Sequence, residues 1–120
     1  MKQISFTIPG EPRVQKRHRD RRGGGKFDPS AGDKEAFAWQ AKALCPPDYE
    51  PMECDLHMVL MCQGTYMRGD IDNYLKFVMD ALNGIYYKDD KQFKLVSVSL
   101  AKSEEPKTMV NISPWEPGPV

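Results

Sequence analysis

Residues 69–84 read GDIDNYLKFVMDALNG, which places two acids ahead of a helical pattern of apolar residues with a glycine at its end. At 100° per residue the apolar side chains share one broad helix face: Ile71, Tyr74, Leu75, Val78, Met79, Ala81 and Leu82. The remaining strip is polar and charged, with Lys76 one turn beyond Asp72. Asp70 or Asp72 can cap the first turn, and Asn83-Gly84 can end the helix. The stretch predicts a buried helix that presents one charged strip.

A second acidic pair, Asp89-Asp90, follows shortly and enters a strand-like run. Each acid taken singly is explained as a helix cap or a turn, but four acids near two element boundaries repel one another without a cation. Carboxylate oxygens on two nearby segments are the ligands that Mg²⁺ requires, and such an ion can activate water at a phosphodiester. The residues therefore indicate a divalent-metal site, and they leave open whether Asp89 or Asp90 is the ligand.

Residues 13–29, the basic loop, carry most of the positive charge of the N-terminal part of the chain. From Arg13 to Lys26 there are seven Lys or Arg residues and one acid, whereas the rest of the chain has ten basic and sixteen acidic residues. A net charge of zero thus hides a basic loop and an acidic body. We interpret the loop as a nucleic-acid-binding segment that orders on contact, the alternative being a solubilising segment. Its basic residues bind phosphates without reading sequence: Arg13, Lys16, Arg17, Arg19, Arg21, Arg22 and Lys26.

The remaining patterns predict a small two-layer α+β domain of order β-α-β-α-β-β. With 120 residues there is room for one compact domain, which we place at residues 1–113, with 114–120 as a C-terminal extension. We expect a hairpin between the last two strands. The predicted strands cover residues 3–8, 53–62, 91–102 and 108–113. The first predicted helix covers residues 30–44, and residues 69–84 are a loop that runs into the second helix.

The first of these helices carries three finer predictions. Ser30 with Asp33 approximates a capping box. Lys34 is expected to face water, and Trp39 to pack in the core in preference to stacking on a base. Three cysteines with no Cys-x-x-Cys spacing argue against a disulfide framework and against a zinc site.

The motif Asp70-x-Asp72-Asn73-x-x-Lys76-x-x-x-Asp80-Ala81-Leu82-Asn83-Gly84, followed by Asp89-Asp90, resembles the RusA family of Holliday junction resolvases. The segment Ile8-Pro9-Gly10-x-Pro12 with its basic loop extends the resemblance over most of the chain. By residue, the family's metal-binding aspartates match Asp70, Asp72 and Asp90, and its catalytic lysine matches Lys76. Asn73 matches the asparagine after the second aspartate. Ahead of Asp70 only Arg68 is basic, where some members carry a basic run.

The resemblance implies a RusA-like fold and a Mg²⁺-dependent endonuclease, with Mn²⁺ able to substitute, that nicks four-way DNA junctions in recombination and repair. It also implies a homodimer, because two symmetric nicks match a two-fold protein, and a bacterial or phage origin. No apolar run is long enough to span a membrane, so we expect a cytoplasmic protein with no membrane partner. No phosphate-cradling glycine motif indicates a nucleotide cofactor.

Two other functions fit part of the sequence. A non-catalytic module for branched or single-stranded nucleic acid would use the basic loop and would be indifferent to Mg²⁺. A metal-dependent enzyme acting on a phosphorylated small molecule would use the acids but leave the basic loop unexplained.

Overall fold

The computed structural model describes residues 3–16, 19–20 and 26–116, with the side chains of residues 19, 20 and 26 left out of the description. The main elements follow the predicted order β-α-β-α-β-β, so the α+β fold class is confirmed. They are β1 (Ile4–Pro9), α1 (Ala31–Ala43), β4 (Leu56–Gly64), α2 (Ile71–Leu82), β5 (Phe93–Lys102) and β6 (Lys107–Pro114). Within the basic loop, β2 (Arg19–Asp20) pairs with β3 (Lys26–Phe27), and a short 3-10 helix, η1 (Asp90–Gln92), precedes β5.

The predicted hairpin between β5 and β6 is wrong. The sheet order is β1-β6-β4-β5, so β6 lies between β1 and β4 and pairs antiparallel with both, while β5 pairs parallel with β4. Parallel strands need a long crossover connection, which α2 supplies between β4 and β5. Alternate residues of β6 are buried, as expected of a strand with one face against the helices, whereas β5 is an edge strand and is more exposed.

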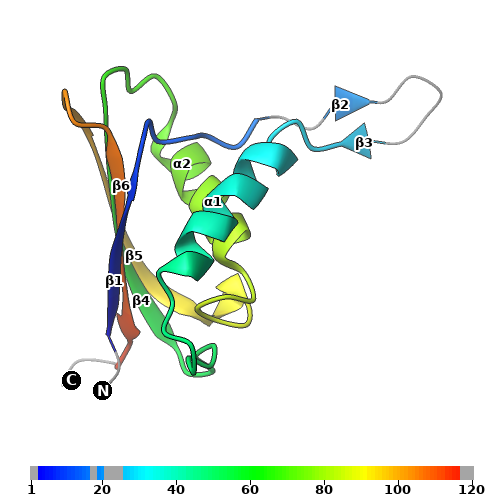
Figure 1. Cartoon of the computed structure of the whole chain (residues 1–120), viewed down its shortest axis with the longest axis vertical. Coiled ribbons are helices and arrows are strands. Elements are labelled where there is room, and N and C mark those ends of the chain that lie inside the picture. Colours follow the sequence, from blue (N-terminus) through cyan, green and yellow to red (C-terminus); the bar gives the residue numbers. More distant parts are fainter. Residues whose placement is uncertain (1–2, 17–18, 21–25, 117–120) are drawn as a thin grey trace.

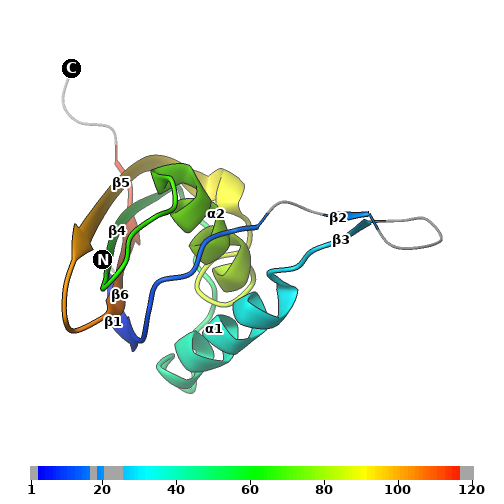
Figure 2. The same ribbon diagram turned by 90° about the horizontal axis from the view of Figure 1, so that it is seen from above.

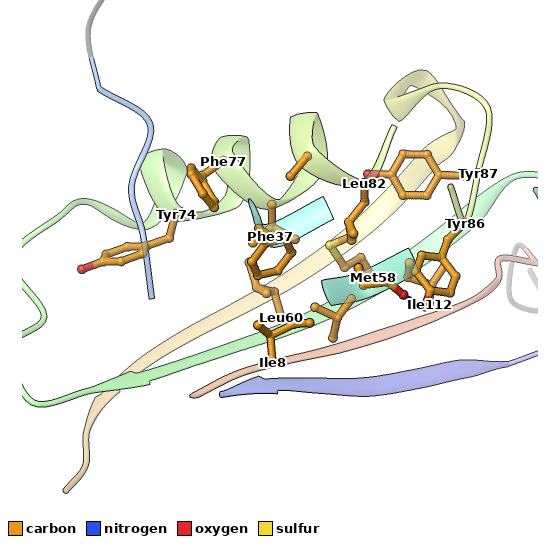
Figure 3. Packing of buried hydrophobic residues seen from close by; sticks show 14 of the residues in the cluster. Ile8, Phe37, Met58, Leu60, Tyr74, Phe77, Leu82, Tyr86, Tyr87 and Ile112 are labelled. Atoms are coloured by element: carbon orange, nitrogen blue, oxygen red, sulfur yellow. Dashed lines mark hydrogen bonds between the residues drawn. The ribbon is translucent and has the colours of Figure 1, made fainter. Parts of the chain in front are cut away.

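Both helices cover the same face of the sheet, as two views at right angles show (Figures 1 and 2). Along β4 the residues that face the helices are buried, and those between them are more exposed, which is the alternation expected of a sheet covered on one side. The two helices meet through Phe37 and Phe77, whose rings lie edge to face with centroids 5.8 Å apart. Figure 3 shows the core between the layers, which includes Leu60, Tyr74 and Ile112.

The hydroxyl groups of two core tyrosines are satisfied by helix carbonyls. Tyr86 donates a hydrogen bond to the Ala41 carbonyl at 2.7 Å, and Tyr87 donates one to the Met79 carbonyl at 2.7 Å. A buried hydroxyl group without a partner would cost free energy, and these bonds avoid that cost. They also attach both helices to the segment that follows α2.

Three predictions for α1 are wrong. Trp39 is 69% exposed, because it lies two residues, or about 200° of helix rotation, from both buried positions, Phe37 and Ala41. Ser30 precedes α1 but makes no side-chain cap, since its hydroxyl is engaged elsewhere. Lys34 does not face water; its side chain is 15% exposed and pairs with two acids.

The described residues contain no disulfide and no membrane-spanning helix. Cys45, Cys54 and Cys62 are all free thiols, which agrees with the absence of a disulfide framework. In the part of the chain that the structure covers, no helix combines the length and the apolar character needed to cross a membrane.

Leu60→Ala is expected to lower the free energy of unfolding by about 2–5 kcal/mol, because Leu60 is fully buried on β4 beneath both helices. The matched control is Leu44→Ala at the end of α1, where the side chain is 53% exposed and the expected change is within about 0.5 kcal/mol. Urea unfolding followed by circular dichroism measures both. Equal destabilisation of the two variants would contradict the described core.

Candidate metal and nucleic-acid site

Helix α2 positions the predicted site because its apolar face is fixed. Tyr74, Phe77 and Val78 are buried against the sheet and α1, so rotation of the helix about its axis is prevented. The polar strip must then face away from the core, and Asp72 and Lys76 are both exposed. The hydrophobic pattern therefore determines where the charged side chains point.

Asp70 stands at the N-cap position of α2, but its carboxylate does not cap the helix. Its backbone is extended, with φ −79° and ψ 153°, and no side-chain capping hydrogen bond forms. Its carbonyl oxygen accepts the first helical bonds, from the N–H of Asn73 and of Tyr74. The explanation of Asp70 as a helix cap alone therefore does not hold, and its exposed carboxylate lies at the positive end of the helix dipole.

The charged strip repeats at four-residue intervals through Asp72, Lys76 and Asp80. At 1.5 Å per residue, Asp72 and Asp80 are about 12 Å apart along the helix axis, with Lys76 midway. Lys76 is thus one turn from each acid and can interact with an anion bound near either.

The two acids of the later pair have different surroundings. Asp89 caps η1: its carboxylate accepts from the Lys91 N–H at 3.0 Å, and its own N–H donates to Gln92 Oε1 at 2.9 Å. The hydrogen bond from Lys91 is the main cause of a lowered pKa at Asp89, and the bond with Asp90 adds to it. The pKa of Asp90 is raised, chiefly by that shared hydrogen bond, then by burial and by the charges of Asp89 and Asp80. The ionised form of the Asp90 carboxyl group is therefore disfavoured, and a cation bound nearby would favour it.

Among the described residues, no three His, Cys, Asp or Glu side chains are grouped so that they could hold a metal ion. Asp70 and Asp72 stand together at the start of α2, whereas Asp90 is within electrostatic reach of Asp80, farther along. Two hard carboxylates nevertheless fit Mg²⁺, which commonly takes one or two protein carboxylates and completes its shell with water and substrate phosphate. The assignment of Asp90 as a third ligand stays a prediction.

The base of the basic loop is bonded to the helix that carries these acids. The Gln15 N–H donates to the Asn73 carbonyl at 3.0 Å, and the Gln15 side-chain amide donates to Asp28 Oδ1 at 2.9 Å. The Lys16 N–H donates to the Ser30 hydroxyl at 2.8 Å. These bonds join the two ends of the loop to each other and to α2. Gln15 and Ser30, which make them, are both buried.

Lys34 links the same loop base to α2 through two carboxylates. Its Nζ lies 2.7 Å from Asp28 Oδ2 and 3.3 Å from Asp80 Oδ2. The hydrogen bond from Lys34 holds the pKa of Asp28 well below its usual range, and bonds from the Ser30 N–H and Gln15 act in the same direction. Asp80 is thereby engaged in an ion pair, which sets it apart from Asp70 and Asp72.

The structure covers the predicted DNA-binding residues only in part. Arg13 and Lys16 are exposed at the base of the basic loop. Arg19 and Lys26 are described by their backbone in β2 and β3, and Arg17, Arg21 and Arg22 lie outside the described residues. The β2–β3 pair extends away from both layers, beyond the start of α1 (Figure 2). Arg68 is exposed, and its guanidinium lies 4.3 Å from the centroid of the Tyr66 ring.

Comparison with known proteins gives a family match that covers this whole arrangement. The family model for endodeoxyribonuclease RusA matches residues 9–113. The chain belongs to the RusA family. The match includes the basic loop, both helices and both acidic pairs, and membership implies endodeoxyribonuclease activity. The chain is also similar to the protein YqaN of Bacillus subtilis (strain 168), an uncharacterized protein. The two are 31% identical over an alignment of 134 positions, which covers 91% of this chain and 94% of that protein.

Sequence reasoning missed the residues that fix the loop to the helix: Gln15, Asp28 and Lys34. Lys34 and Asp80 are 46 positions apart, and no local pattern signals a contact over that separation. Asp28 had a local signal, because an aspartate two residues before Ser30 suits an Asx turn, and Asp28 Oδ1 indeed accepts from the Ser30 N–H at 2.8 Å.

Lys34→Met is expected to lower the free energy of unfolding at pH 7 by about 1–3 kcal/mol, because it leaves two partly buried carboxylates without their cation. The lowered pKa of Asp28 stabilises the fold above the ordinary value of 3.8, and this contribution is lost as the pH falls through the folded-state pKa. The difference between the parent and Lys34→Met should therefore shrink below about pH 4. Lys42→Met, on an exposed position of α1, is the control. A difference that does not change between pH 7 and pH 2.5 would contradict the ion pair.

Proposed function

We propose that this RusA-family chain is a Mg²⁺-dependent endonuclease that resolves four-way DNA junctions by paired, symmetric hydrolysis of two phosphodiesters. The observation that carries the proposal is the exposed Asp70 carboxylate, which stands at a helix N-terminus without capping it and is followed by Asp72 in the first turn of the helix. The proposal places the protein in DNA recombination and repair, in the cytoplasm of a bacterium or encoded by a phage.

Asp70 and Asp72 would hold the metal ion, with Asp90 as the third carboxylate and Mn²⁺ able to replace Mg²⁺. When bound, the ion supplies charge that lowers the pKa of a coordinated water and neutralises phosphate oxygens. Asp89 is the weaker choice of ligand, because its carboxylate already caps η1. The pKa of Asp90 is raised chiefly by its hydrogen bond with Asp89, then by burial and by the negative charges of Asp89 and Asp80, and those charges support a cation beside it.

Lys76 would hold the scissile phosphate and stabilise the negative charge that develops on it. Its exposed position on the strip, one turn beyond Asp72, supports this role. Asn73 supports the site through its carbonyl, which receives the Gln15 N–H and so keeps the basic loop beside the start of α2. The basic residues of the loop, together with Arg68, would bind the phosphates of the junction arms.

A homodimer is part of the proposal, because two symmetric nicks call for two copies of the site. Among the described residues, both helices lie on one face of the sheet and no helix covers the other (Figure 1). A shallow cavity on that face is lined in part by Val59, Met61 and Met109, and Met61 is exposed. Apolar side chains on an uncovered sheet face support its use as the contact between copies.

The alternative is a non-catalytic module that binds branched or single-stranded DNA. It is favoured by one observation, namely that the described residues contain no grouping of three metal-ligating side chains. Such a module would bind junctions equally well with Mg²⁺ or with EDTA and would cut none.

The first test uses a synthetic four-way junction with a mobile core, in Mg²⁺ or in EDTA. The parent chain is expected to make paired symmetric nicks only in Mg²⁺, and Asp72→Asn and Lys76→Met are expected to slow nicking by about 100-fold or more. Lys102→Met, an exposed lysine on β5, is the control and should cut normally. Sedimentation of the protein–junction complex should give two chains per junction. Tight binding with no nicks in Mg²⁺ or Mn²⁺ would overturn the enzyme and leave the binding module.

The second test separates the two acids of the later pair. Asp90→Asn should reduce nicking about as much as Asp72→Asn does, by about 100-fold or more, because a ligand charge is lost. Asp89→Asn should keep most of the activity, since asparagine also serves as a helix cap. Junction binding in EDTA, measured for each variant, separates loss of chemistry from loss of DNA contact. Full activity in Asp90→Asn with none in Asp89→Asn would exchange the two assignments.

A further inference from the structure

The loop that delivers the chain from β4 to the acids, residues 65–70, is held rigidly at its start. The N–H and the hydroxyl of Thr65 both donate to the Glu11 carboxylate, at 2.6 Å and 2.8 Å. A Cβ added at Gly64 would stand 2.8 Å from Met67 Sδ and 3.1 Å from Glu11 Oε1. The start of the loop is therefore packed against the segment that follows β1.

The other end of the loop is packed just as closely. A Cβ at Gly69 would lie 2.4 Å from Val14 Cγ1 and 3.0 Å from the Tyr74 ring, so only glycine fits there. The Gly69 N–H donates to the Tyr74 hydroxyl at 3.3 Å. With both ends fixed, residues 66–68 are presented in a defined position directly before Asp70.

This loop exposes an aromatic ring that the core does not use. Tyr66 is 67% exposed, and the Arg68 guanidinium lies 4.3 Å from its ring centroid. The guanidinium makes a cation–π contact with one face of the ring, and the exposure of Tyr66 leaves ring surface accessible to a partner. Ile71, on the other side of Asp70, is 51% exposed. In the sequence, the predicted metal ligand Asp70 is thus flanked by two exposed side chains with apolar surface, Tyr66 and Ile71.

Exposed apolar surface beside two carboxylates is not explained by phosphate binding, which requires cations and N–H donors. It does suit a nucleobase, because stacking on an aromatic ring needs only a free base face. In a continuous duplex the base faces are covered by their neighbours, whereas at a branch point the stack is interrupted and a face is available.

We propose that Tyr66 is a specificity-determining residue that stacks on a nucleobase exposed at the branch point of the DNA, with Arg68 supporting the opposite face of the ring. The proposal rests on the function proposed above and adds to it a means by which the chain distinguishes a junction from linear duplex. The basic loop supplies affinity for either DNA, and Tyr66 supplies the preference for the branched one.

The test measures DNA binding in EDTA with Asp72→Asn as the parent, so that no cleavage occurs. A four-way junction with 2-aminopurine at the crossover is compared with a linear duplex of the same sequence. Tyr66→Ala in this parent should weaken junction binding about 5- to 100-fold and leave duplex binding within about two-fold. In the parent, stacking of Tyr66 on 2-aminopurine should quench its fluorescence, and Tyr66→Ala should remove this quenching. Tyr66→Phe should keep both the affinity and the quenching, since the ring is retained.

Trp39→Ala is the matched control, because Trp39 is 69% exposed on α1 and lies outside this loop. Its junction affinity should equal that of the parent. Unfolding by urea, measured on every variant, excludes loss of fold as the cause of weaker binding.

Three outcomes would overturn the inference. Unchanged junction binding in Tyr66→Ala, or equal weakening for junction and duplex, would remove the specificity role while the proposed function stood. A shift in sedimentation from dimer to monomer in Tyr66→Ala would assign the ring to contact between copies. Failure of the parent to prefer a junction over duplex would overturn the proposed function and this inference together.

Discussion

The burial of one face of α2 is the constraint on which the rest of the structure depends. Tyr74, Phe77 and Val78 fill the space between the sheet and α1, and the helix cannot rotate without exposing them. Because α2 also supplies the crossover between the parallel strands β4 and β5, its direction is set by the sheet. Its charged strip is therefore positioned by hydrophobic packing, and the polar residues to which we assign the chemistry need not stabilise their own arrangement.

The basic loop would be of little use if it moved freely relative to those acids. The bonds from Gln15 to Asn73 and from Lys34 to Asp28 and Asp80 join its base to the same helix. One helix thus organises two surfaces of opposite charge: a carboxylate pair at its start and a cationic extension bonded alongside. In the proposed function, DNA held by the extension would be attracted to one surface and repelled by the other, and a divalent cation beside the carboxylates would reduce that repulsion.

How much of this could be predicted from the sequence depends on the range of each interaction. The element order and the face of α2 follow from local periodicity, and they were predicted correctly. The pairing of β6 with β1 and β4 depends on contacts across the whole chain, such as Ile4 with Ile112, and the local rule for hairpins gave the wrong neighbour. The prediction that Lys34 faces water is wrong because its position on the helix shows only that the side chain points away from the apolar stripe. Helical position does not show that Asp28 and Asp80 lie close to it. The acidic motif indicated the correct family. The different surroundings of Asp89 and Asp90 could be recognised only from the structure, in which Asp89 caps η1.

The strand order has a consequence for how the chain is made. Among the described strands β6 comes last in the sequence but occupies an interior position, and without it β1 and β4 have no partner in common. β1 therefore has no neighbour in the sheet until residues 107–114 have been synthesised. Formation of the sheet thus depends on contacts between distant segments, such as Ile4 with Ile112, and such non-local pairing makes folding slow. A nascent chain stalled before residue 107 lacks the strand that joins the two parts of the sheet and exposes two strand edges to other chains.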